Sequence, residues 1–311
     1  MSYPVRLITC DEKDALYAKY SSFPFHTAKA DISGCCVKLY TLSSSVKDMW
    51  EDNFHSMSES VRSHARLVCL DEPGRPLEVL YEPLTKTAFL FNFDYYGWIK
   101  SVALAMAGDI LEDGHDIHSV HGAALDIDGK GMTLIAPSKT GKTTHSWGLL
   151  RSSSVRLVTD DWYYVRLSER RPVAYGSEKN CYIDADIGSI WDEYRGLVER
   201  TAFDDRQRAV VNVRWVTGKG SVVPMMTVHE VVLLKRDRGD PQMVRELDPE
   251  EAWEYLAAND LCNPHQMVRG ERKMRLRERF FRQFLSQCQV HLVNTVASPQ
   301  EAQEAIRRLV Q

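Results

Sequence analysis

A short segment in the middle of the chain, from Ala136 to Thr144, has the residue types of a phosphate-binding loop. In such a loop a glycine, here Gly141, lets the backbone approach the phosphates, while Lys142 can reach the β and γ phosphates and the Thr143 hydroxyl can bind Mg²⁺. A tight loop that runs into a helix also offers backbone N–H groups and the positive end of the helix dipole. Although Ala136 replaces the usual first glycine, we expect the segment to bind a nucleoside triphosphate through Ser138, Lys139, Thr140, Gly141, Lys142, Thr143 and Thr144.

Two adjacent carboxylates, Asp160 and Asp161, follow the apolar residues Leu157 and Val158. The interval between Lys142 and Asp160 allows one helix to cross and one strand to return beside the strand that precedes the loop. Ligands bind at the carboxyl ends of the strands in an open α/β sheet, so the carboxylates should lie next to the loop. One of them can hold Mg²⁺ and the other can accept a proton from an attacking hydroxyl. The alternative is that both merely cap a loop and face solvent.

His121 and Gly122 stand in the strand that comes before the loop. A histidine at this place can contact the γ-phosphate or the metal. Taken alone, however, a histidine in a strand is more often a core or edge residue with its hydrogen bonds satisfied, so both interpretations stay open on these residues alone.

The elements that must position these groups can be predicted from hydrophobic patterns and turn residues. Ser119–Ile127 is expected to be a strand, 128–131 a turn, Met132–Ala136 a second strand, Thr143–Leu150 a helix and Val155–Val158 a buried strand. Farther on, Val228–Leu234 is expected to be a strand, and helices are expected at Pro249–Leu256 and Arg272–Leu285.

The first part of the chain has the patterns of an α+β module. Cys36–Thr41, Arg66–Leu70 and Ala88–Phe93 are expected to be strands, and Val46–Met57 and Tyr96–Leu111 helices. We place a domain boundary near residue 93. Residues 1–93 then form an N-terminal α+β domain, with substrate recognition as its expected role, and residues 94–311 form the domain that binds the nucleotide.

Composition excludes several classes of partner. The 311 residues include 39 Lys and Arg against 43 Asp and Glu, and this net charge of −4 gives no general attraction to nucleic acid or to an acidic membrane. No apolar segment is long enough to cross a bilayer, and the start of the chain does not have the pattern of an export signal. The seven cysteines are scattered and show no zinc-site spacing. We therefore expect reduced thiols and a cytoplasmic protein.

The segment from Ser119 to Asp161 resembles the catalytic core of the HPr kinase/phosphorylase family. That family has, in order, a His-Gly strand, a Gly-x-Gly turn, a strand, Ser-x-x-Gly-Lys-Ser/Thr, a helix and a Val-x-Asp-Asp strand, and this chain has the same order and spacing. The resemblance implies an α/β fold with a P-loop-containing catalytic domain like that of HPr kinase and phosphoenolpyruvate carboxykinase. It implies that Lys142 and His121 are catalytic, that Asp160 is the general base, and that Asp161 joins Thr143 at Mg²⁺. The two aspartates can also exchange these roles.

The region before Ser119 does not look like the N-terminal domain of that family. HPr-kinase-like enzymes also include kinases that modify ribosomal peptides, some at the terminal serine of lasso-peptide precursors, and this chain looks more like that group. The resemblance implies an ATP- and Mg²⁺-dependent kinase acting on a seryl-type hydroxyl of a peptide or protein, and a homo-oligomer. The alternatives are a kinase of small-molecule hydroxyls and a nucleotide-binding sensor without catalysis. Phosphoenolpyruvate carboxykinases are the more distant resemblance.

Overall fold

The computed structural model describes residues 3–310 as mixed α/β structure in two compact units. The first unit holds the chain up to Ile117 together with Ser177–Lys179 and Pro264–Met274, and the second holds the rest. The boundary expected near residue 93 falls just before helix α3 (Tyr96–Gly114), which groups with the first unit. Among residues 3–310, no helix combines the length and the apolar character needed to cross a membrane.

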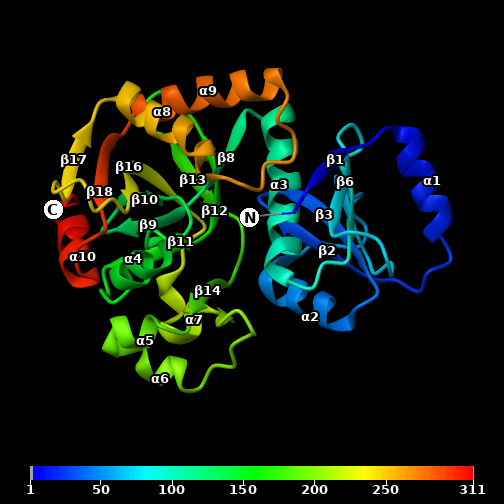
Figure 1. Ribbon diagram of the computed structural model, residues 1–311, viewed down its shortest axis with the longest axis horizontal. Coiled ribbons are helices and arrows are strands. Elements are labelled where there is room, and N and C mark those ends of the chain that lie inside the picture. Colours follow the sequence, from blue (N-terminus) through cyan, green and yellow to red (C-terminus); the bar gives the residue numbers. More distant parts are fainter. Residues whose placement is uncertain (1–2, 311) are drawn as a thin grey trace. The chain divides into compact units, whose positions relative to one another are not determined.

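A seven-stranded mixed sheet is the framework of the first unit (Figure 1). In spatial order its strands are β1 (Val5–Leu7), β6 (Glu78–Glu82), β7 (Thr87–Phe91), β5 (Ala65–Leu70), β3 (Cys35–Thr41), β2 (His26–Ile32) and β4 (His55–Ser56). Strands β3, β5 and β7 run parallel, whereas β2 pairs with β3, and β6 with β7, in antiparallel fashion. The strands predicted at β3, β5 and β7 are confirmed.

Helices cover both faces of this sheet because side chains alternate between the faces along each strand. On one face, Leu80 packs with Tyr17 and Tyr20 of α1 (Cys10–Tyr20). On the other face, the neighbouring Tyr81 donates a hydrogen bond to Asp109 of α3, with an O···O distance of 2.7 Å. Helix α2 (Ser44–Asn53) packs against β2 and α3, and it ends before the predicted Met57 because β4 begins at His55.

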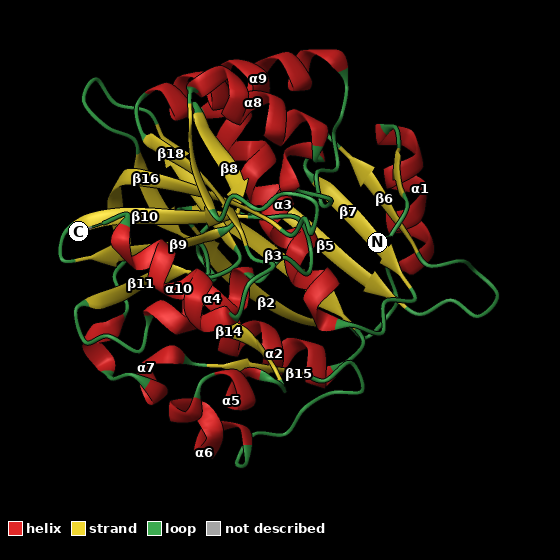
Figure 2. Cartoon of the chain, turned by 60° about the vertical axis from the view of Figure 1, so that its left-hand side comes forward, coloured by secondary structure: helices red, strands yellow, loops and turns green. Residues whose placement is uncertain are grey.

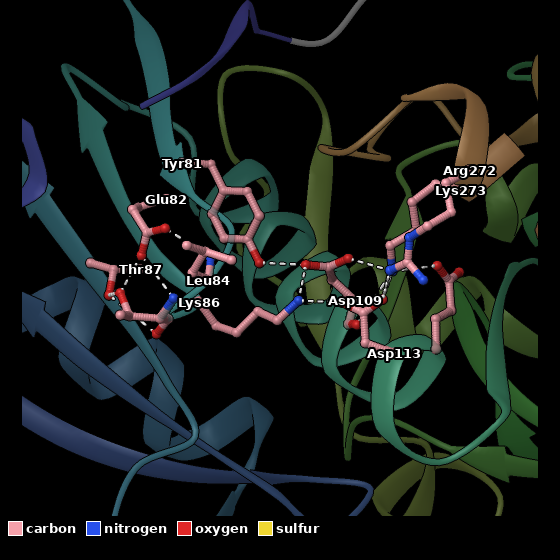
Figure 3. Close-up of polar contacts among 11 residues, drawn as sticks. Tyr81, Glu82, Leu84, Lys86, Thr87, Asp109, Asp113, Arg272 and Lys273 are labelled. Carbon is pink, nitrogen blue, oxygen red and sulfur yellow. Dashed lines mark hydrogen bonds and ion pairs between the residues drawn. The ribbon is translucent and has the colours of Figure 1, made fainter. Parts of the chain in front are cut away.

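Charged side chains form a largely buried network around α3 within the first unit (Figure 3). The Lys86 ammonium lies 2.6 Å from a carboxylate oxygen of Asp109 and 2.6 Å from one of Asp113. Lys273 lies 2.7 Å from Asp109 and 3.3 Å from Glu112. Burial alone would raise the pKa of Asp109, but the two lysines outweigh it and hold that pKa below its ordinary value. Losing one lysine would leave a buried carboxylate uncompensated, so the network is expected to fix α3 firmly in its unit.

The second unit is built on a nine-stranded sheet. Along its main path the order is β11 (Val155–Thr159), β9 (Ala123–Ile127), β10 (Lys130–Ile135), β16 (Met225–Lys235), β13 (Val173–Gly176), β12 (Trp162–Arg166) and β8 (Ile117–His121). The other two strands are β18 (Gln289–Asn294), which runs parallel to β16, and β17 (Val244–Leu247), which pairs with β18. A separate two-stranded sheet consists of β14 (Cys181–Asp184) and β15 (Arg208–Val211).

Helices α4 (Lys142–Leu149) and α10 (Pro299–Arg308) pack against one another on the side of strands β9 and β10 (Figure 2). Trp147 of α4 is buried in the core between these layers with Leu134 and Val232 of the sheet. The remaining helices are α5 (Ile187–Ile190), α6 (Arg195–Val198), α7 (Val213–Val216), α8 (Pro249–Ala258) and α9 (Glu271–Ser286). The predicted strand at β16 and the predicted helices at α8 and α9 are confirmed.

Two predictions about this sheet are wrong. The segment Ser119–Ile127 is not one strand, because β8 ends at His121 and β9 begins at Ala123. Gly122 separates them at a place where a Cβ atom would lie 2.6 Å from the Leu134 carbonyl oxygen, so only glycine fits there. Strand β11 does not lie beside β10, because β9 lies between them and pairs with both in antiparallel fashion. Strands β10 and β11 therefore point the same way, and their carboxyl ends share one edge of the sheet.

Candidate functional site

The phosphate-loop segment connects the end of β10 at Ile135 to the start of α4 at Lys142. Gly141 precedes α4 with a φ of 99°, a left-handed value that L residues rarely adopt, and a Cβ atom there would lie 3.2 Å from the ring of His145. Lys139 is also left-handed, with a φ of 67°. Ser138 and Lys139 are exposed, Thr140 is buried, and 141–144 are half-buried. The loop thus ends with the free backbone N–H groups of a helix N-terminus, a common setting for anion binding.

Side chains from distant parts of the chain hold this loop. The Thr295 hydroxyl lies 2.8 Å from the Thr140 carbonyl oxygen and 3.1 Å from that of Lys235, so one proton serves both. The Thr140 hydroxyl donates to the Pro137 carbonyl at 2.7 Å, and the Trp191 indole donates to the Thr144 carbonyl at 2.9 Å. Thr295 and Trp191 could not be predicted from the sequence, because each contacts the loop only through a backbone carbonyl and neither belongs to a motif.

His145 of α4 is buried beneath Gly141 and pairs with Gln303 of α10. The Gln303 amide lies 3.0 Å from His145 Nδ1, and with its nitrogen turned toward that atom its oxygen accepts from the Leu149 N–H at 3.3 Å. Burial lowers the pKa of His145, and a hydrogen bond donated to Nδ1 by the Gln303 nitrogen also favours the neutral ring. Burial therefore favours the neutral form of His145, which lies beneath the loop.

Lys142 turns toward the aspartate pair. Its ammonium nitrogen donates to the Asp160 carbonyl oxygen at 2.6 Å and to Asp161 Oδ1 at 2.9 Å. The two aspartates differ in accessibility: Asp160 is buried, with 3% of its surface exposed, whereas the Asp161 side chain is 28% exposed. Because β10 and β11 end at the same edge, the aspartate pair lies beside the loop, although β9 separates the two strands.

His121 completes the group from the end of β8. Its Nε2 lies 3.2 Å from Asp161 Oδ1, and its Nδ1 lies 2.6 Å from the Cys262 carbonyl oxygen. The Trp162 ring packs against it edge to face, with 5.9 Å between the centroids. The backbone N–H of Gly122 donates to the Asp161 carbonyl at 3.0 Å, which ties the end of β8 to the aspartate turn. The structure therefore brings His121, Lys142 and Asp161 together.

The donors suited to a metal at this place are oxygens. Thr143 follows Lys142 in the first turn of α4. The Asp161 carboxylate accepts a hydrogen bond from the Lys142 ammonium. Hydroxyl and carboxylate oxygens are ligands that Mg²⁺ prefers. Within residues 3–310, no group of three or more His, Cys, Asp or Glu side chains gathers in a way that could hold a metal ion by itself.

Taken together, a helix N-terminus, a lysine, the Asp161 carboxylate and a histidine meet at one edge of the sheet, with the buried Asp160 next to them in the chain. Such a set can neutralise phosphate oxygens, hold a hard cation and accept a proton.

Neither a protein-family model nor a curated protein matches the chain.

Proposed function

We propose that the protein is an ATP- and Mg²⁺-dependent kinase of the HPr-kinase-like type, which transfers the γ-phosphate to a seryl-type hydroxyl of a peptide or protein. The observation that carries this proposal is that Lys142 and His121 converge on Asp161 Oδ1, at 2.9 and 3.2 Å, beside a strand–loop–helix segment. Phosphoryl transfer depends almost entirely on positioning and on neutralising charge, and these residues supply both.

Each residue has a distinct role in the proposed reaction. Lys142 exchanges the Asp161 carboxylate for oxygens of the β and γ phosphates when the nucleotide enters. Asp160 accepts the proton of the acceptor hydroxyl as its oxygen forms a bond to the γ-phosphorus. The bond between that phosphorus and the bridging oxygen breaks, and its electrons leave with ADP. His121 lies beside Asp161, where it can contact the γ-phosphate or the metal.

Thr143 and Asp161 are the proposed protein ligands of Mg²⁺. That ion usually takes one or two carboxylates together with substrate phosphates and waters, so two oxygen donors from the protein are sufficient. When bound, it neutralises charge on the transferring phosphoryl group and aligns the triphosphate.

The acceptor class comes from the resemblance rather than from a contact in the structure. Within it, the C-terminal serine of a ribosomal peptide precursor is the specific case that we favour, with residues 1–93 serving recognition. A cytoplasmic location and a homo-oligomer belong to the same proposal.

A transfer assay with γ-labelled ATP tests the proposal. The acceptors are a peptide that ends in serine, the same peptide ending in alanine, and glycerol as a simple hydroxyl compound. We expect Mg²⁺-dependent label on the serine peptide alone, with none after addition of excess EDTA. Label on glycerol alone would favour a small-molecule kinase, and nucleotide binding without transfer to any acceptor would favour a sensor.

Lys130→Ala is the matched control variant for this assay. Lys130 is an exposed lysine of the second unit that donates to the Val310 carbonyl and contacts none of the proposed catalytic residues. It should behave as wild type in every arm.

A further inference from the structure

Three consecutive residues near the end of the second-unit segment Asn180–Asn263 have left-handed backbones. Asp260, Leu261 and Cys262 have φ values of 53°, 53° and 52°, and none of them is glycine. L residues visit this region as single residues, because the Cβ atom crowds the following carbonyl, so a run of three is unusual. Backbone strain of this kind persists only where the surroundings fix it, and it is concentrated at functional sites.

The surroundings do fix this turn. Leu261 and Cys262 are buried, with 2% and 4% of their surfaces exposed. The Cys262 N–H donates to the Asn259 carbonyl at 2.9 Å, and the Asn263 N–H donates to the Asp260 carbonyl at 3.0 Å. The turn is therefore a defined structure with two internal hydrogen bonds and a buried apolar side chain.

The turn presents the Cys262 carbonyl oxygen to His121 Nδ1 at 2.6 Å. A carbonyl oxygen can only accept, so Nδ1 must carry the proton in this contact. The opposite ring nitrogen, Nε2, then points at Asp161. Which nitrogen of a functional histidine faces the reacting groups is set by the hydrogen bond that the other nitrogen makes.

The Cys262 thiol does not account for the contact. Burial raises the pKa of this thiol to about 12, so it stays protonated and unreactive. The group that meets His121 is the main-chain carbonyl, and its direction is set by the left-handed backbone.

We propose that the left-handed turn Asp260–Cys262 is a positioning element, which fixes the proton of His121 on Nδ1 and directs Nε2 to Asp161 for phosphoryl transfer. The catalytic part of this inference rests on the proposed kinase function. Its structural part, the protonated nitrogen of His121, can be measured without any turnover.

Asp260 is the residue at which the turn can be tested, because its side chain is exposed. Proline at this position imposes a φ near −65° and cannot adopt the left-handed value, whereas glycine adopts it freely. Asp260→Pro should therefore displace the Cys262 carbonyl, and Asp260→Gly should keep it while removing the same carboxylate. Asp260→Val, which disfavours the left-handed region but keeps the backbone N–H, serves if the proline variant does not fold.

The decisive measurement is the ¹⁵N spectrum of the imidazole rings in full-length protein labelled at histidine, at about pH 8, above the ordinary histidine pKa of about 6.5. His121 is assigned by the signal lost in His121→Gln. Wild type and Asp260→Gly should show a protonated Nδ1 at His121, and Asp260→Pro or Asp260→Val should lose it, while the signal of His145 stays unchanged.

In the transfer assay, kcat should fall about 10- to 100-fold in Asp260→Pro, the range seen when the partner that orients a metal-bound histidine is removed. The KM for ATP should stay within about twofold of wild type, and Asp260→Gly should restore kcat. Ser33→Pro, which breaks a half-buried left-handed turn in the first unit, controls for a general loss of stability. Its kcat per folded molecule should match wild type.

An unprotonated Nδ1 at His121 in wild type would overturn the inference. So would a proline or valine variant that keeps both the Nδ1 signal and the wild-type kcat. If wild type shows the protonated Nδ1 but transfers no phosphate to any acceptor, the structural role stands and the kinase proposal fails.

Discussion

Lys142 and His121 contact the same oxygen of Asp161, at 2.9 and 3.2 Å. One carboxylate oxygen therefore links the phosphate loop after β10 to the end of β8. A triphosphate offers oxygens of the same charge and kind, so Lys142 can leave Asp161 for a phosphate without losing a charged partner. We therefore expect the contact between Lys142 and Asp161 to be replaced by a contact between Lys142 and a phosphate when nucleotide binds.

Lys142→Ala should abolish transfer and leave the fold intact. The side chain is only 14% exposed, but its partners are a carbonyl and a carboxylate that water can reach, not an apolar core. Charge stabilisation of a transferring phosphoryl group contributes about 10³- to 10⁵-fold to the rate. The initial rate of label transfer and the melting temperature measure the two effects. A variant that keeps more than about a tenth of the wild-type rate would contradict the phosphate-loop assignment.

Thr295→Val should weaken nucleotide binding. The substitution keeps the shape of the side chain but removes the proton shared by the Thr140 and Lys235 carbonyls, next to Gly141. A carbonyl left without its partner in a buried place costs about 1–3 kcal/mol, so affinity for ADP measured by calorimetry should fall by about 5- to 150-fold where that cost appears on binding. Thr295→Ser keeps the hydroxyl and should bind ADP nearly as wild type does. Equal affinity in wild type and Thr295→Val would show that the loop does not depend on this contact.

The local parts of the site could be predicted from sequence, and the long-range parts could not. Gly141, Lys142 and the two aspartates stand in patterns whose chemistry is local, and the structure places them together. The division of Ser119–Ile127 into β8 and β9 escaped prediction because it depends on the approach of Leu134 to Gly122, a contact between strands. The turn at Leu261 escaped because Asp, Leu and Cys all ordinarily prefer negative φ, so tertiary contacts must impose the left-handed backbone.

The pH dependence of stability should report on His145. Burial lowers its pKa in the folded state, so the unfolded chain binds more protons there at acidic pH. Its contribution to stability is complete above the unfolded pKa of about 6.5 and is lost as the pH falls through 6.5 toward the folded pKa. Between pH 7.5 and 5.5, the melting temperature of wild type should fall more steeply than that of His145→Gln. His26→Gln, at an exposed histidine of β2, should keep the wild-type slope, and equal slopes for all three proteins would contradict this role.

The two aspartates differ in burial and contacts, and the difference leads to opposite expectations for their amide variants. Asp161 is the more exposed carboxylate and contacts Lys142 and His121, as suits a group beside a metal and a triphosphate. Asp160 is buried, and its backbone carbonyl accepts from Lys142. A carboxylate shielded from bulk water suits a general base, because the proton it accepts then comes from the acceptor hydroxyl rather than from solvent.

Asp160→Asn should keep the affinity for nucleotide and Mg²⁺ nearly unchanged and lower the single-turnover rate by about 10²- to 10⁴-fold, the usual contribution of a general base. The amide has the same shape but cannot accept the hydroxyl proton. Asp161→Asn should weaken Mg²⁺ and nucleotide together, because a charge is lost beside the metal and Lys142 loses its ionic partner. Calorimetric titration of both variants with ADP, with and without Mg²⁺, separates the effects. If Asp160→Asn loses Mg²⁺-dependent binding while Asp161→Asn binds normally, the two roles are exchanged, and if neither variant is impaired, this pair of carboxylates is not the catalytic centre.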